Sequence, residues 1–228
     1  PELALITGLK VERSSFTGWQ LLPNLRIAWQ PDQSTLLWAA VSRAVRTPSR
    51  IDPELIARGF LGEGVDCHWE KRGGVGPGSR GQPPPATTVS VNGFVNIYDD
   101  IRTTEFTGDP FPIRLRNGLE GRSYGIEAWG TAQLAPWWRL SLGATTLWKD
   151  FEFKDGVVDL AGGDSLGNDP SWQLKAASHF ELAPKLQLNI HGRAVDGIER
   201  DPEIDGYVEA GARLAYQLNE TLELFVAG

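Results

Sequence analysis

The stretch that decides the fold is Lys185-Leu186-Gln187-Leu188-Asn189-Ile190-His191-Gly192-Arg193-Ala194. Apolar or small side chains occupy every second position, and polar side chains occupy the positions between them. Because successive side chains of a β-strand point to opposite faces, this alternation predicts a strand with one apolar and one polar surface. The same pattern recurs at 124–134, 138–148, 172–182 and 208–217.

These predicted strands are long for a soluble protein. They last about 10 to 12 residues, whereas soluble strands most often have about 5 to 6 and a tilted bilayer-crossing strand needs about 9 to 11. Tight turns alternate with long polar segments, the turns at 31–34, 135–136, 183–184 and 219–220 and the segments at 47–87, 101–118, 151–171 and 197–206. This asymmetry is typical of an outer-membrane β-barrel. A soluble β-sandwich is the alternative, but it explains neither feature.

Counting these patterns gives ten predicted strands, at 3–13, 20–30, 35–46, 88–99, 119–134, 137–149, 172–182, 185–196, 207–217 and 221–228. Aromatic residues such as Trp138, Trp148 and Trp172 fall near the strand ends, where a membrane barrel places them at headgroup level. We therefore predict an all-β fold, a transmembrane antiparallel β-barrel of which the chain holds a part.

Composition removes several other classes of protein. The chain has 228 residues, a formal net charge of -7, 9 Trp, 1 Cys and no Met. The aromatic content excludes a disordered chain, and the single Cys67 excludes a disulfide scaffold. Acidic residues outnumber basic ones and the basic ones are scattered, so we expect no nucleic-acid partner. The last residues lie within a predicted strand, so we expect an excerpt of a longer barrel.

Several stretches resemble the barrel domain of TonB-dependent outer-membrane receptors. They are PNLRIAWQP at 23–31 with LWAAVSRAVRTPSR at 37–50, NGFVNIYDDIR at 92–102, and NGLEGRSYGIE at 117–127. The resemblance implies a 22-stranded barrel that is plugged by a separate N-terminal domain. Residues 1–228 would then be a partial barrel domain of about 10 to 11 strands, without the plug domain and the final strand.

The resemblance also implies a function and a set of partners. Members of the family import scarce nutrients, mostly iron–siderophore complexes, with energy relayed through TonB. The implied partners are a ferric siderophore or other small nutrient, the TonB complex through the missing N-terminal part, and lipids of the Gram-negative outer membrane. We expect no catalysis and no cofactor. A passive porin-type channel and a structural or adhesion barrel remain as alternatives.

Glu127 is the candidate site residue of the predicted inner wall. Alternation places it on the polar face with Gly125, Trp129 and Thr131. In the family, a glutamate in this Gly-x-Glu setting points into the lumen and pairs with arginines of the plug. An enclosed carboxylate needs such a partner, because leaving a charge unpaired away from bulk water is costly. A solvated lumen carboxylate without a special role is the alternative.

Three arginines form the second candidate site. Arg43, Arg46 and Arg50 lie at the outer end of a predicted strand, where they could contact an anionic siderophore or the phosphates of lipopolysaccharide. No metal site is predicted. A pair of lumen histidines, His179 and His191, and the acidic segment 196–205 are better interpreted as solvated polar groups than as metal ligands.

Residues 60–86 break the pattern. The family has a strand here with a motif like Glu-Ala-Gly-Tyr-Arg, but residues 73–81 are dominated by glycine and no alternation is visible. One set of synonymous codons for residues 69–76, read from its third nucleotide, encodes Gly-Glu-Ala-Gly-Trp-Arg-Gly, which contains a motif of this kind. A reading-frame error in the source sequence is therefore one hypothesis, and a genuine loop insertion is the other. Sequencing the gene through codons 60 to 86 decides between them, because an intact frame would end the first hypothesis.

Overall fold

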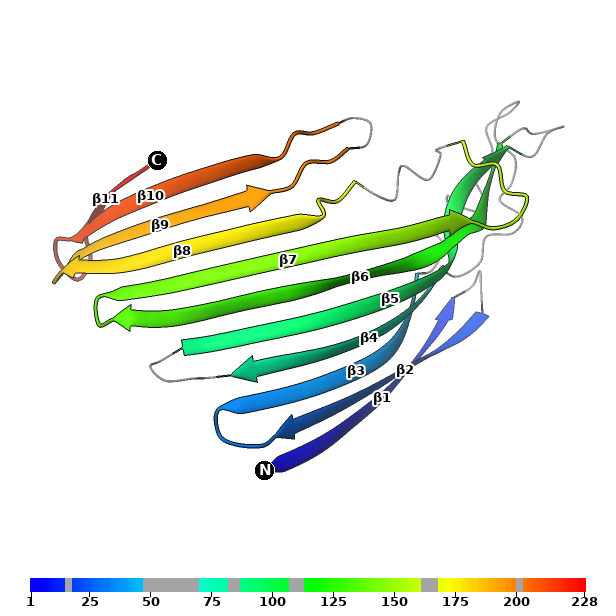
Figure 1. Cartoon of the computed structure of the whole chain (residues 1–228), viewed down its shortest axis with the longest axis horizontal. Coiled ribbons are helices and arrows are strands. Elements are labelled where there is room, and N and C mark those ends of the chain that lie inside the picture. The colour runs from blue at the N-terminus through cyan, green and yellow to red at the C-terminus, as the bar shows by residue number, and fades with distance from the viewer. Residues whose placement is uncertain (15–17, 47–69, 82–86, 107–112, 161–167, 200–202) are drawn as a thin grey trace.

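The computed structural model describes residues 1–14, 18–46, 70–81, 87–106, 113–160, 168–199 and 203–228. They form one antiparallel sheet in which each strand pairs with the next one along the chain (Figure 1). The strands are β1 (Glu2–Ser14), β2 (Gly18–Gln30), β3 (Thr35–Arg46), β4 (Glu70–Gly81), β5 (Thr87–Phe106), β6 (Ile113–Ala135), β7 (Trp138–Phe153), β8 (Trp172–Ala183), β9 (Leu186–Val195), β10 (Tyr207–Gln217) and β11 (Glu223–Ala227). The prediction of an all-β antiparallel fold is confirmed.

The strand β4 corrects the prediction that no strand lies between 46 and 88. It pairs with β3 over its whole length and with β5 on its other side. Side-chain alternation does not reveal it, because glycine has no side chain to alternate. A Cβ atom at Gly76 would lie 2.7 Å from the carbonyl oxygen of Gly93, so glycine permits this close approach. Residues 60–69 and 82–86 lie outside the described part of the chain, and the frame-error hypothesis stays a prediction.

The strands β5 and β6 continue past their predicted outer ends. The prediction of a loop over 101–118 is wrong for 101–106 and 113–118, which pair with each other, while 107–112 lie outside the described residues. The pairing shifts register between Tyr98 and Ile101 and again between Ile101 and Thr103, and Asp100 has a φ of 61°. Such irregularities interrupt the period-two pattern of side chains. The alternation in the sequence therefore does not predict this part of the hairpin.

The sheet has one continuous apolar face. The register aligns Ile126 of β6 with Thr146 of β7, and Leu142 of β7 with Ala176 of β8, so one set of side chains shares a side across neighbouring strands. Large apolar side chains on this side are widely exposed, including Leu142 at 54% and Val208 at 79%. A wall with so much exposed apolar surface fits contact with lipid. We call this side the outer face and the opposite side the inner face.

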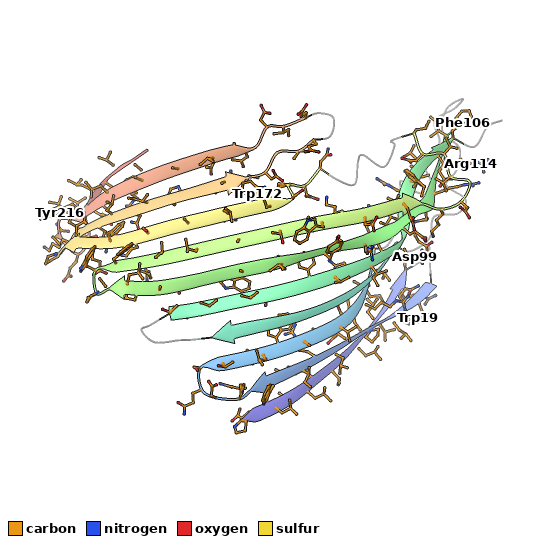
Figure 2. All side chains as sticks on the ribbon, viewed as in Figure 1. Trp19, Asp99, Phe106, Arg114, Trp172 and Tyr216 are labelled. Carbon is orange, nitrogen blue, oxygen red and sulfur yellow. The ribbon has the colours of Figure 1, made fainter. Side chains whose placement is uncertain are left out.

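Aromatic clusters mark the two borders of the apolar band. Trp137, Trp138 and Phe180 stack at one end, with ring centroids 5.6 to 6.3 Å apart, and Tyr124 stacks on Trp148 near the other. Figure 2 shows the same division, with Tyr216 at the short-turn end of β10 and Trp172 at the opposite end of β8. The stretch from Trp138 to Trp148 is about 33 Å of strand, which a tilt of about 40° reduces to a height of about 25 Å. That height matches the apolar band of outer-membrane barrels.

The connections and the edges define the wall as open. Short connections at 31–34, 136–137, 184–185 and 218–222 join strands at the left end of Figure 1. The turn at 31–34 is held by Asp32, whose Oδ1 accepts hydrogen bonds from the Ser34 amide at 2.7 Å and from the Ser34 hydroxyl at 2.6 Å. Within the described residues, β1 pairs only with β2 and β11 only with β10. No helix in this part of the chain is long and apolar enough to cross a membrane.

Candidate functional site: the inner wall around Glu127

The register of three strands places Glu127 on the inner face, as predicted. Glu127 of β6 lies opposite Asn92 of β5 and Thr145 of β7, and Thr145 in turn lies opposite Gln173 of β8. Directly opposed residues of an antiparallel pair share a face, so these polar side chains form one row across the wall. Glu127 itself is exposed, which leaves its carboxylate accessible from the lumen side.

Gly125 leaves room beside Glu127 for an aromatic ring. A Cβ atom built on Gly125 would meet Cζ of Phe94 at 2.8 Å and the carbonyl oxygen of Thr146 at 2.1 Å. No larger residue fits both contacts without a shift of the backbone. The glycine of the Gly-x-Glu pattern therefore has a packing reason: the Phe94 ring occupies the space that a side chain at 125 would take.

A shallow groove of about 290 Å³ lies beside Glu127. Its lining residues come from β6, β7 and β8 and are Glu127, Ala128, Trp129, Gly143, Ala144, Thr145, Gln173 and Lys175. Gly143 forms the floor between Trp129 and Lys175, because no atom lies closer than 3.9 Å to the position of its missing Cβ. Figure 1 shows these three strands side by side, so the groove runs across the wall rather than along one strand.

The polar groups of this groove have no partners among the described residues. Within the described residues, the side chains of Glu127, Thr145, Gln173 and Lys175 make no hydrogen bond, and neither Glu127 nor Lys175 has an oppositely charged group within ion-pair distance. The neighbouring inner-face groups differ. Arg193 pairs with Glu209 at 2.6 Å, and Nδ1 of His179 lies 2.7 Å from Oδ1 of Asn189. The polar side chains of the groove are thus open to solvent or to an external partner, while the wall next to it is internally paired.

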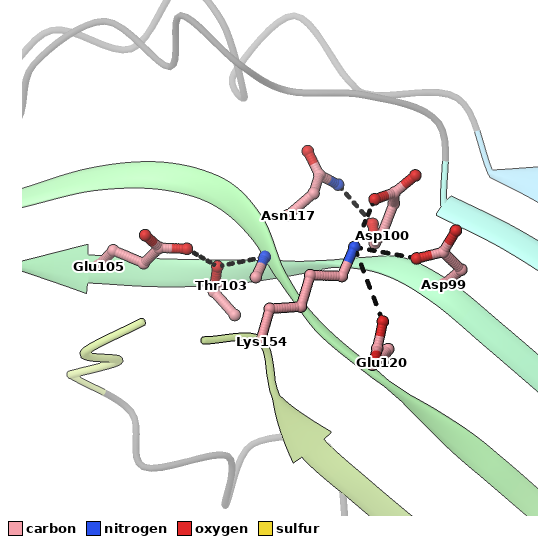
Figure 3. Close-up of polar contacts among 8 residues, drawn as sticks. Asp99, Asp100, Thr103, Glu105, Asn117, Glu120 and Lys154 are labelled. Atoms are coloured by element: carbon pink, nitrogen blue, oxygen red, sulfur yellow. Dashed lines mark hydrogen bonds and ion pairs between the residues drawn. The ribbon is translucent and has the colours of Figure 1, made fainter. Parts of the chain in front are cut away.

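At the long-loop end, Lys154 holds together residues that are distant in sequence. Its Nζ lies 2.9 Å from a carboxylate oxygen of Asp99, 2.7 Å from one of Asp100 and 4.0 Å from one of Glu120 (Figure 3). Burial lowers the pKa of Lys154, but the hydrogen bonds that Lys154 donates to Asp100 and Asp99 outweigh it, so the pKa is raised above its ordinary value of 10.5. Lys154 therefore stays charged at neutral pH and fastens β7 to the irregular part of β5.

Beyond Lys154, the chain crosses over and adds to the outer end of β5. The Phe106 amide donates to the carbonyl of Val158 at 3.0 Å, and the Leu160 amide donates to the carbonyl of Thr104 at 2.8 Å. Within the β5–β6 hairpin, the Thr103 hydroxyl donates to the Glu105 carboxylate at 2.6 Å and accepts from the Gly118 amide at 3.0 Å (Figure 3). This outer end is a paired, hydrogen-bonded extension of the wall. Sequence reasoning missed it, because the bulges erase the alternation.

The structure separates the predicted arginine cluster. By alternation along β3, Arg43 follows Val41 on the outer face and Arg46 lies on the inner face, while Arg50 lies outside the described residues. The Arg43 guanidinium donates to the carbonyl of Leu21 at 3.3 Å and to Gln20 Oε1 at 3.0 Å. The arginines therefore do not form one site within the part of the chain that is described.

His179 and His191 lie on the same, inner face of the sheet. His179 lies opposite Asn189 and His191 lies opposite Ala177 on the paired strands β8 and β9. Among the described residues, no group of three or more His, Cys, Asp or Glu side chains is arranged to hold a metal ion. The acidic segment 196–205 includes residues 200–202, which lie outside the description.

An antiparallel wall with an exposed apolar outer face, aromatic borders and a polar inner face defines a membrane β-barrel protein of the outer-membrane type. More narrowly, the chain belongs to the family described as TonB dependent receptor-like, beta-barrel, whose model matches residues 76–228. The sequence-based identification of the family is thereby confirmed. No curated protein sequence matches the chain.

Solved structures support the same fold. The ferric enterobactin receptor PfeA from Pseudomonas aeruginosa superposes with a TM-score of 0.77 at 15% identity, over 100% of this chain and 37% of that one. The siderophore receptor PirA from Acinetobacter baumannii gives a TM-score of 0.79 at 14% identity, over 99% and 38%. At such identities the likeness concerns the fold alone. The chain spans less than two fifths of the length of these proteins, as expected for a partial barrel.

Proposed function

We propose that the protein is an active outer-membrane receptor that imports an iron–siderophore complex or a similar scarce nutrient, with energy supplied through TonB. The family match over 76–228 carries this proposal. The proteins with the same fold are named as receptors for ferric enterobactin and for siderophores. A polar inner face fits the passage of a polar solute, and binding followed by gated passage requires no enzymatic chemistry. The cell location that follows is the outer membrane of a Gram-negative bacterium.

Energy dependence distinguishes this proposal from a passive channel. We expect the full-length protein to restore growth on a ferric siderophore as sole iron source in a receptor-deficient strain, and to lose this ability when TonB is deleted. The measurement is uptake of radioactive iron supplied as siderophore complexes of different classes, with and without TonB. Uptake that persists without TonB would favour the porin-type alternative, and a correctly inserted protein with no uptake would favour a structural barrel.

Within this receptor, we propose that Glu127 contacts a plug domain in the lumen. Three features support the proposal: the inner-face position, the exposed carboxylate, and the absence of an ion-pair partner among the described residues. A carboxylate that will be enclosed needs a cation or several hydrogen-bond donors. Arginine side chains of the plug have the required bidentate geometry.

We propose different roles for the two described arginines of β3. Arg43, on the outer face, contacts phosphates of outer-leaflet lipopolysaccharide, and Arg46, on the inner face, contacts the ligand. We expect Arg43→Gln to lower the amount of lipopolysaccharide that copurifies with the full-length receptor and to leave ligand affinity unchanged. Arg46→Gln should weaken ligand affinity about tenfold, the value of one charge-assisted hydrogen bond. Identical effects of the two substitutions in both assays would contradict the division.

A further inference from the structure

We infer that Lys175 is a second contact residue of the inner wall, and that Lys175 and Glu127 together recognise a complementary pair of charges on the plug domain. The inference rests on the proposed function, because it needs a domain in the lumen. Its own basis is the groove, in which an ammonium and a carboxylate that have no ion-pair partner among the described residues lie on opposite sides of Gly143 and Thr145.

The two charged groups do not neutralise each other. Glu127 belongs to β6 and Lys175 to β8, with β7 between them. Two strand spacings and an offset of two residues along β7 separate their backbones by about 12 Å, and the pair does not reach ion-pair distance in the structure. Each charge therefore keeps its capacity to bind an external partner. When the groove is covered, both need one, because an enclosed charge without a partner is costly.

The groove also has the shape and the neutral donors that such a contact requires. Gly143 leaves its floor open, and Thr145 and Gln173 offer a hydroxyl and an amide that no described residue uses. On one flank, Trp129 presents an indole that is 49% exposed although it belongs to the inner face. An exposed aromatic ring beside unpaired polar groups is the composition of a protein contact surface.

Charge complementarity specifies the occupant. It must present a cation toward Glu127 and an anion toward Lys175, together with apolar surface for Trp129. A folded domain of the same receptor can hold two such side chains at a fixed separation. A diffusing ferric siderophore complex of uniform negative charge would match Lys175 but would be repelled by Glu127. The geometry therefore favours the plug over the solute.

The test is hydrogen–deuterium exchange of the full-length receptor in detergent, with protection of the lumen domain as the readout. We expect Lys175→Glu to raise the exchange rate of plug amides that contact the wall about tenfold, the cost of one charge-assisted contact. Lys175→Gln should have a smaller effect. The control Lys185→Glu makes the same charge change at the β8–β9 turn, where Lys185 reaches the carbonyl of Leu218 at 3.4 Å, and should leave plug protection unchanged.

A charge swap separates this idea from a simple internal pair. If Lys175 and Glu127 served only each other, the double variant Glu127→Lys with Lys175→Glu would recover wild-type protection, and the inference would be wrong. We expect no recovery, because each variant side chain would then face the wrong charge of the plug. Unchanged protection in Lys175→Glu with weaker ligand binding would assign Lys175 to the solute and overturn the inference alone. A wild-type receptor without any protected lumen domain would overturn the proposed function as well.

Discussion

Replacing Leu142 with arginine is expected to destabilise the membrane-inserted receptor by about 2–4 kcal/mol, the cost of a cation near the midplane of a barrel's lipid-facing side. Leu142 is 54% exposed on the outer face, and it lies between the aromatic borders at Trp138 and Trp148. The guanidinium of an arginine at this position would be dehydrated and surrounded by hydrocarbon. It would also lie far from the headgroup layers on both sides of the membrane. The measurement is reversible unfolding of the full-length receptor in lipid vesicles.

The neighbouring residue provides the matched control. Ser141 precedes Leu142 on the same strand, but its side chain belongs to the inner face, opposite Thr131 of β6 and Ala177 of β8. Ser141→Arg introduces the same cation at the same depth on the wet side of the wall, so we expect less than about 1 kcal/mol of destabilisation. Equal costs for the two variants would mean that the two faces are not divided between lipid and lumen, and would reject the assignment of the outer face.

Substituting Glu127 with glutamine is expected to loosen the plug domain in the full-length receptor. The change keeps the size of the side chain and removes its charge, so it converts charge-assisted hydrogen bonds into neutral ones that are roughly half as strong. Half of the roughly 1.5–3 kcal/mol of such a bond is about 0.8–1.5 kcal/mol, and its loss raises the population of the loosened state about four- to tenfold. The measurement is the rate at which a protease cleaves the plug, together with uptake of the ligand.

The control for this prediction is Glu181→Gln. Glu181 lies near the short-turn end of β8, outside the groove, with His179 as its neighbour at 3.8 Å. The same chemical change there should leave plug cleavage and uptake unaltered. Plug retention and transport that are unchanged in Glu127→Gln would reject the assigned role, whereas barrel migration on a gel without heating shows independently that each variant is folded.

Sequence reasoning succeeded where alternation is regular. The segments 185–196 and 207–217 were predicted as strands and are observed as β9 and β10, with shifts of one residue at most. Glu127 was assigned to the polar face from the same alternation, and the register confirms this position. Its contact with a plug stays a prediction, because no contact among the described residues tests it.

Sequence reasoning failed where the period of two is absent. The glycines of β4 carry no side chain that could reveal a face, and the register shifts near Asp100 and Ile101 hide the outer ends of β5 and β6. The alternation over 172–182 places Lys175 on the polar face of its strand, but it does not single this residue out. Lys175 lies in the same groove as Glu127 only because β7 pairs with both β6 and β8. It also has no ion-pair partner among the described residues, which the sequence of one strand cannot show.

The sequence by itself determined the class of the fold and the two faces of the wall, because side-chain direction along a strand is a local property that repeats every two residues. The tertiary structure decided which residues meet. Lys154 reaches Asp99 and Asp100 across more than fifty positions, and Glu127 shares a groove with Lys175 across β7. These contacts depend on strand order and register, which are set by backbone pairing between distant segments and leave no local signal in the chain.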